Sequence, residues 1–307
     1  MSKTPENEQS ASTNGATPRA WWVLLIGVSG VYFWAYWTTI SDLVTEWQTN
    51  PNYSVGLLVP PAALYLLWHD RKSLQRCRLS PAWSGIAVIL VAQAGRAFGL
   101  VWLYESAERY ALVLTLVGVV LLVGGWGVFW RTRWILLFLL LMVPLPGRIH
   151  LMISGPLQEY ATRGAVFGLE LLGVVVGRQG NRVMLNDEVP VNIAEACSGL
   201  RMLTAFVVVA AVLAYVIGRP RWQKFVLVVS SVPIAVACNV FRLVVTALLF
   251  LNLQSDLAER FFHDFAGFTM MPVAVLMLLL EMWVLSKLVV ADPAGGVRAV
   301  RADGIAT

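Results

Sequence analysis

Charged side chains are scarce in this chain of 307 residues. Asp, Glu, Lys and Arg make up 13% of the sequence, against 58% for hydrophobic residues. This composition excludes an ordinary water-soluble protein and is typical of a polytopic membrane protein. The net charge of +5 therefore does not indicate a nucleic-acid partner, because the basic residues lie mostly in short loops between apolar segments.

Cysteine and histidine are also few. The three cysteines, Cys77, Cys197 and Cys238, show no CxxC or Cys/His spacing, so neither a zinc site nor a disulfide framework is expected, and no metal or cofactor is predicted. The sequence shows no soluble domain, no internal repeat, and no early apolar stretch that ends in a cleavage site of the secretory type.

Long apolar runs are what the sequence has instead. A spanning helix needs about 20 apolar residues. The segments that approach this length are 21–40, 54–68, 83–103, 110–130, 134–145, a sixth from Cys197 or Ser198 to residue 217, then 225–250 and 266–290. Pro60-Pro61 predicts a kink in the second segment. The predicted fold class is an all-α polytopic membrane protein with about eight transmembrane helices.

The ends of the chain are polar. We interpret residues 1–20 as a disordered cytoplasmic tail, residues 21–291 as the transmembrane domain, and residues 292–307 as a second cytoplasmic tail. Between the fifth and sixth segments, residues 164–177 are apolar but interrupted by Glu170, which favours an interfacial or re-entrant helix packed in protein.

Loop charge orients the segments. The loops after the second, fourth and sixth segments are basic, and the alternate loops are acidic, so the positive-inside rule places both termini in the cytoplasm. The basic loops hold Arg71, Lys72, Arg76, Arg78, Arg131, Arg133, Arg219, Arg221 and Lys224, and the acidic loops hold Asp42, Glu46, Glu105, Glu108, Asp256 and Glu259. Residues 146–196 are then expected to begin and end on the extracytoplasmic side of the membrane. Two short strands around Asn186-Asp187 predict a small extracytoplasmic hairpin there.

Cys197 lies where a polar stretch meets the sixth apolar segment. A thiol in the first turn of a helix is favoured as the thiolate by the helix dipole, and free N–H groups nearby suit an oxyanion. The alternative is a small buried apolar residue, which is what we expect of Cys77 and Cys238. Arg201, one turn later, either lowers the thiol pKa or pairs with Glu195.

Arg242 and His263 are the other polar residues that stand out. A charge at membrane depth costs about 2.5–3.5 kcal/mol and is usually functional or paired. Asn239 lies three residues before Arg242 and so shares its helix face, whereas the alternative is a snorkelling arginine. His263 suits a general acid or base, or else an interfacial histidine followed by the cap Asp264. The topology places Cys197, Arg242 and His263 on one outer face.

Four stretches together resemble the exosortase/archaeosortase family of membrane cysteine transpeptidases. Residues 50–60 are similar to the amino-terminal motif of that family, and residues 194–201 to its nucleophile motif. Residues 233–242 resemble its arginine motif, and residues 263–267 its histidine motif. One departure is Val55, where members of the family often have histidine within the Tyr-Ser-x-Gly element.

The resemblance implies a function. The enzyme would cleave exported proteins that carry a carboxy-terminal Pro-Glu-Pro-like motif, a transmembrane helix and a basic cluster, at the outer face of a bacterial inner membrane. Cys197, Arg242 and His263 would be catalytic, and Arg201, Asn239 and Glu195 would bind the substrate. Two other classes stay open: a transporter or channel that uses Arg242, and a structural scaffold of the membrane.

Overall fold

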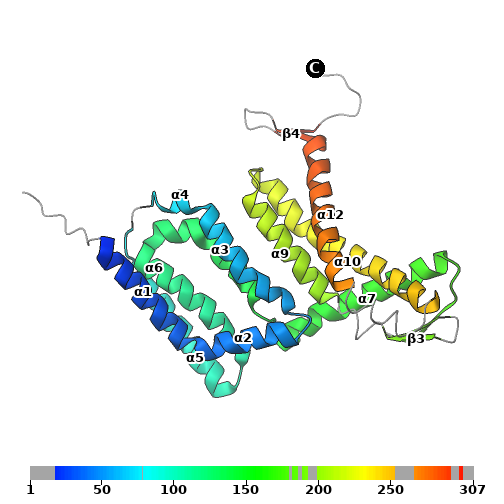
Figure 1. Ribbon diagram of the computed structural model, residues 1–307, viewed down its shortest axis with the longest axis horizontal. Helices are drawn as coiled ribbons and strands as arrows, with labels where there is room; N and C mark the ends of the chain where they lie inside the picture. Colours follow the sequence, from blue (N-terminus) through cyan, green and yellow to red (C-terminus); the bar gives the residue numbers. More distant parts are fainter. Residues whose placement is uncertain are drawn as a thin grey trace, which may run out of the picture. The chain divides into compact units, whose positions relative to one another are not determined.

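The computed structural model describes residues 18–77, 79–179, 182–185, 189–192, 199–252, 266–291 and 297–299. Figure 1 shows their helices and strands. Two compact units divide the chain, residues 1–42 and 43–307. The first unit contains α1 (Pro18–Ala35) and the beginning of α2 (Trp37–Thr49). The predicted first segment, 21–40, is thus divided by a turn at Tyr36 rather than forming one helix.

The second apolar segment begins as a 3-10 helix and continues as an α-helix. The two parts are η1 (Ser54–Leu58) and α3 (Val59–His69), and α4 (Arg71–Leu74) follows. Pro60 and Pro61 lie in the first turn of α3, where the 3-10 helix gives way to the α-helix, and the kink predicted at these prolines stays a prediction. The first turn of a helix accepts proline because its N–H groups have no partner inside the helix.

α5 (Ser84–Trp102) confirms the third predicted segment to within one residue at each end. The fourth and fifth segments both lie in α6 (Glu105–Phe138), which η2 (Leu139–Met142) extends. We predicted a break at the basic residues Arg131 and Arg133, but these are helical. The break lies at Gly125, whose φ of 78° and ψ of −175° interrupt the helix and divide α6 into two legs. Only glycine adopts this conformation readily.

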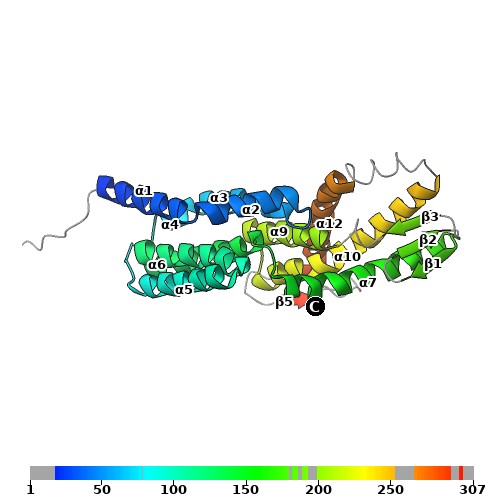
Figure 2. The same ribbon diagram turned by 90° about the horizontal axis from the view of Figure 1, so that it is seen from below.

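The connection to the sixth segment is more helical than predicted. α7 (Gly147–Leu171) has Pro156 inside it and covers the first half of the stretch expected to be re-entrant. Three antiparallel strands follow, β1 (Val176–Gln179), β2 (Arg182–Leu185) and β3 (Val189–Asn192), in the order β1-β2-β3. The pairing of β2 with β3 confirms the predicted hairpin, whose Asn186-Asp187 turn lies outside the described residues, whereas β1 was missed. Figure 2 shows the strands beside the end of α7.

The carboxy-terminal helices are α9 (Leu200–Val216), α10 (Arg221–Asn252) and α12 (Ala266–Leu288). β4 (Val289–Ala291) and β5 (Val297–Ala299) then pair as a short antiparallel ladder. α10 packs against α7, α9 and α12. A buried cluster joins α9, α10 and α12, and consists of Met202, Phe206, Ala235 and Cys238 with Val273 packed against them.

Three helices of the described part are long and apolar enough to cross a membrane. They are Ser84–Trp102, Glu105–Met142, which Gly125 divides into two legs, and Arg221–Leu251. Shorter apolar helices include Ser54–His69 and Leu200–Val216. The chain is therefore a mostly helical, multi-pass membrane protein. The count of eight crossings stays a prediction.

Contacts between helix ends agree with the alternation of loop charge. Tyr215 at the end of α9 donates a hydrogen bond of 2.5 Å to Asp70 after α3, and Arg131 of α6 bonds the hydroxyl of Ser73. All four residues belong to ends that loop charge assigns to one side. Tyr53, which loop charge assigns to the other side, hydrogen-bonds the carbonyl oxygen of Leu145 there.

Candidate functional site

Arg242 and Asn239 form a polar pair on α10. Nη2 of Arg242 donates a hydrogen bond of 2.9 Å to Oδ1 of Asn239. Asn239 is 2% exposed, and Arg242 is half-buried. The prediction that the two side chains share one helix face is confirmed. Because the guanidinium is bonded within a helix that is apolar enough to span a membrane, its orientation is set by the helix itself.

The beginning of α9 lies directly against this pair. Gly199 precedes α9 with a φ of 66°, in the left-handed region, and a Cβ built on it would be 3.2 Å from Nδ2 of Asn239 and 3.8 Å from Cβ of Leu157 on α7. Both the backbone conformation and the close approach favour glycine. Helices α7, α9 and α10 therefore meet at Gly199.

The position of Gly199 corrects the prediction for the sixth segment. α9 begins at Leu200, not at Cys197 or Ser198, because a left-handed residue cannot lie inside a right-handed helix. The described helix thus begins two or three residues later than predicted, and the environment of the Cys197 thiol stays a prediction. Cys197, Glu195 and His263 lie outside the described residues. Arg201 is exposed in the first turn of α9.

α7 packs closely against α10 next to Arg242. A Cβ on Gly164 would lie 2.8 Å from Cγ2 of Val240, and one on Gly168 would lie 2.9 Å from Cγ2 of Val244. Gly164 and Gly168, four residues apart, thus lie at a helix–helix contact. It adjoins a buried apolar cluster formed by Ala161, Ala165, Leu169, Leu185, Leu243 and Ala247.

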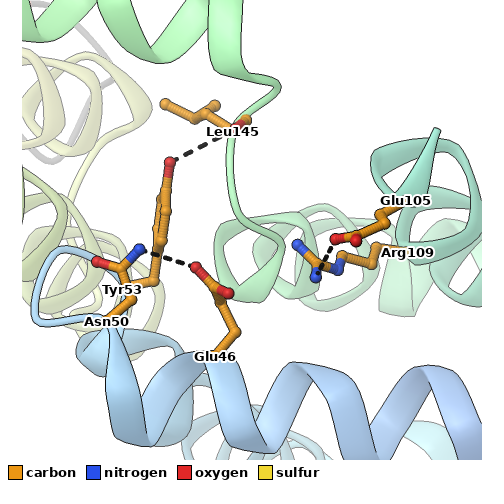
Figure 3. Close-up of polar contacts among 6 residues, drawn as sticks. All are labelled: Glu46, Asn50, Tyr53, Glu105, Arg109 and Leu145. Atoms are coloured by element: carbon orange, nitrogen blue, oxygen red, sulfur yellow. Dashed lines mark hydrogen bonds and ion pairs between the residues drawn. The ribbon is translucent and has the colours of Figure 1, made fainter. Parts of the chain in front are cut away.

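A second polar cluster surrounds the Asn-Pro-Asn-Tyr-Ser stretch, as Figure 3 shows in part. Nδ2 of Asn50 donates a hydrogen bond of 2.8 Å to Glu46, and the hydroxyl of Tyr53 is 3.4 Å from the carbonyl oxygen of Leu145. The same hydroxyl is 2.7 Å from Nδ1 of His150. A phenol has one proton to donate, so Nδ1–H of His150 donates to it whenever the phenol donates to Leu145.

The Tyr53–His150 contact was missed by sequence reasoning, because 97 positions separate the two residues. Val55, at the position where the resemblance led us to expect histidine, is buried at 5% exposure. The imidazole of His150 lies beside Tyr53, two residues before Val55. Burial raises the pKa of the Tyr53 phenol above its ordinary value, and the carboxylate of Glu46 raises it further. The phenol therefore stays protonated at neutral pH.

α7 connects the two polar clusters. His150 lies in its first turn and Leu157, beside Gly199, lies seven residues later. Seven residues make about two helical turns, so both face the same side of the helix, about 10 Å apart along its axis. Within the described residues, no group of three His, Cys, Asp or Glu side chains is placed to hold a metal ion.

Together these features define a multi-pass helical membrane protein with a polar site where α7, α9 and α10 meet. The family model described as transmembrane exosortase matches residues 47–280, and the chain belongs to this family. The match includes all four stretches in which the resemblance was seen. No curated protein and no solved structure matches the chain.

Proposed function

We propose that this protein is an integral-membrane cysteine protease and transpeptidase that cleaves a carboxy-terminal sorting signal of exported proteins. Family membership supports a membrane transpeptidase-type role in general. The observation that carries the residue assignment is the contact of Gly199 with the Asn239–Arg242 pair. The substrates are exported proteins with a carboxy-terminal motif, a transmembrane helix and a basic tail, and the site faces the outer side of a bacterial inner membrane.

Cys197 is the nucleophile of the proposed reaction. Its thiolate attacks the scissile carbonyl carbon and forms a carbon–sulfur bond, while Arg242 stabilises the negative oxygen of the tetrahedral intermediate. The carbon–nitrogen bond then breaks, and His263 gives its proton to the leaving amine. An acceptor amine, or water, attacks the resulting thioester and releases the thiolate.

Chain connectivity supports the role of Arg242. Cys197 is two residues before Gly199, and two residues of chain span at most about 7 Å. Gly199 itself lies against Asn239, the hydrogen-bond partner of Arg242. A fixed guanidinium favours a thiolate through its positive charge, and this effect would add to that of a helix dipole. Asn239, together with Arg201 and Glu195, is proposed to bind the substrate.

The proposal is tested by a processing assay in cells. Candidate substrates with a motif, helix and basic tail are followed by mass on gels, at equal membrane abundance of each enzyme variant. We expect Cys197→Ala and Arg242→Ala to abolish the mass shift, and His263→Ala to lower it strongly. Cys77→Ala is the matched control, because this half-buried thiol lies in the turn after α4, and its loss leaves processing unchanged.

The same assay separates the proposal from a transporter. Cys197→Ser keeps the size and polarity of the side chain but supplies a much weaker nucleophile, so we expect severely impaired processing. A transport function would tolerate this change. Full processing by Cys197→Ala contradicts the enzyme proposal.

A further inference from the structure

A cavity of about 520 Å³ lies between α5 and the two legs of α6. We call it the α5–α6 groove. Its walls are almost entirely apolar, and it includes Gly95 on α5, Tyr110 and Leu114 on the first leg, and Arg133 and Leu137 on the second. A Cβ built on Gly95 would have no atom within 4 Å, so this wall is open. Leu137 is more than half exposed, so the groove opens at the protein surface.

The dimensions of the groove suit a chain narrower than a helix. Along the first leg it extends from Ala107 to Val117, ten residues or about 15 Å of helix. A helix of that length and about 10 Å across would fill on the order of 1,200 Å³. The groove has less than half of this volume. It lies within the usual range for small ligands, about 300–1,000 Å³.

One end of the groove is cationic and aromatic. The guanidinium of Arg133 lies 5.1 Å from the ring centroid of Trp130 and 5.2 Å from that of Trp134, and it bonds the carbonyl oxygen of Trp130. Tryptophan with arginine in this arrangement is typical of a membrane–water boundary. The bond from Arg131 to Ser73 brings α4 to the same end.

α4, which Ser73 joins to Arg131, carries two further cations. Its sequence is Arg71-Lys72-Ser73-Leu74, and the guanidinium of Arg71 stacks 4.1 Å from the ring centroid of Trp68. The neighbouring acid, Asp70, accepts the hydrogen bond from Tyr215. An apolar groove with a cation at one end is complementary to a hydrocarbon chain that ends in a phosphate.

We propose that the α5–α6 groove binds one acyl chain of an anionic phospholipid, whose phosphate is held by Arg133. The groove is smaller than a helix of its own length, and the cationic Arg133 repels the basic tail of a sorting signal. The proposal does not depend on the catalytic assignment, because no residue of the groove belongs to the candidate site.

The test uses the full chain in lipid nanodiscs that contain a photoactivatable phosphatidylglycerol, with the reactive group on its acyl chain. After illumination, mass spectrometry maps the labelled peptides. We expect label on α5 and on both legs of α6. Gly95→Leu fills the groove without a clash and lowers this label at least fivefold. Gly30→Leu, on α1, is the matched control: it also meets no atom within 4 Å and leaves the label unchanged.

Arg133→Gln tests the headgroup separately. We expect it to remove the preference for the phosphatidylglycerol probe over a phosphatidylcholine probe with the same reactive chain. The proposal is overturned by equal labelling with both probes in the wild type, or by unchanged labelling in both variants. It is also overturned if a sorting-signal peptide, rather than lipid, cross-links to Gly95-containing peptides.

Discussion

The α7–α10 contact and the wall of the α5–α6 groove at Gly95 place glycine in opposite surroundings. Gly164 and Gly168 bring α7 so close to α10 that a Cβ would lie within 3 Å of Val240 or Val244. Gly95 of α5 meets open space, and Gly125 interrupts α6. The first arrangement brings two backbones together beside a polar pair, and the second leaves room in the groove at Gly95. Close packing is not confined to the first region, because a Cβ on Gly85 of α5 would lie 2.6 Å from the carbonyl oxygen of Gly118 on α6.

The largest effect on substrate processing is expected at the Asn239–Arg242 pair. Arg242→Lys keeps the charge but loses the guanidinium geometry that bonds Asn239. Hydrogen bonds to charged groups contribute about 1.5–3 kcal/mol, so processing should fall about 10- to 100-fold. The measurement is the rate of substrate processing in cells. Arg221→Lys, an exposed position at the start of the same helix, is the control and should be neutral.

The packing comparison is sharpest between two glycines. Gly164→Leu forces side-chain atoms into Val240 and should lower the free energy of unfolding by about 1–3 kcal/mol. Gly95→Leu makes the same change where no atom lies within 4 Å, and leucine is the better helix former, so stability should stay equal or rise by up to about 1 kcal/mol. Denaturant unfolding in detergent micelles compares them. Equal destabilisation by both changes would remove the distinction between the two regions.

Gly199→Ala tests the junction of α7, α9 and α10. A φ of 66° costs a residue with a Cβ about 1–2 kcal/mol, and the added methyl group would lie 3.2 Å from Asn239. We expect processing to fall several-fold with a small loss of thermal stability. Gly218→Ala, whose Cβ would meet no atom within 4 Å, is the control. Normal processing by Gly199→Ala would mean that the start of α9 does not support the site.

The smallest effect on stability is expected at Tyr53, which contacts the chain between α6 and α7. Its hydroxyl contacts Leu145, which follows η2, and His150 in α7. Tyr53→Phe removes these bonds and should cost about 0.5–1.5 kcal/mol of stability. Tyr65→Phe, an exposed tyrosine of α3, should cost nothing measurable.

The raised pKa of Tyr53 adds a pH dependence to this prediction. Its folded-state pKa exceeds the unfolded value of about 10, so the protonated phenol stabilises the fold fully below that pH. This contribution is lost as the pH rises through the folded-state pKa. The stability difference between wild type and Tyr53→Phe should therefore shrink above pH 10. A stability difference between the two proteins that stays constant above pH 10 would contradict the raised pKa of Tyr53.

Patterns within one helix predicted local structure well. The apolar run at 83–103 became α5, and the three-residue spacing of Asn239 and Arg242 gave a bonded pair. The first prediction depends on the length of an apolar run, and the second on helix periodicity alone. The pairing of β2 with β3 likewise followed from two short strands around a turn.

Features that depend on the rest of the fold were missed. Arg131 and Arg133 indicate a membrane boundary, but a helix can pass through such a boundary, and the chain bends at Gly125 instead. The adjacent Gly124-Gly125 was the signal available for that break. The contact of Tyr53 with His150 joins distant segments, and no local pattern encodes it. The left-handed Gly199 lies against Asn239 of α10 and Leu157 of α7, and these contacts are likewise between distant segments.

The most direct test of the central claim is to capture the covalent intermediate. Purified full-length protein in detergent is mixed with a substrate peptide that carries the motif and helix, and the reaction is stopped in acid. We predict an enzyme mass raised by that of the acyl fragment, with the modification mapped to Cys197 and removed by neutral hydroxylamine. The same peptide with Cys197→Ala should give no adduct. Processing without any adduct on Cys197, or an adduct on another residue, would contradict the account.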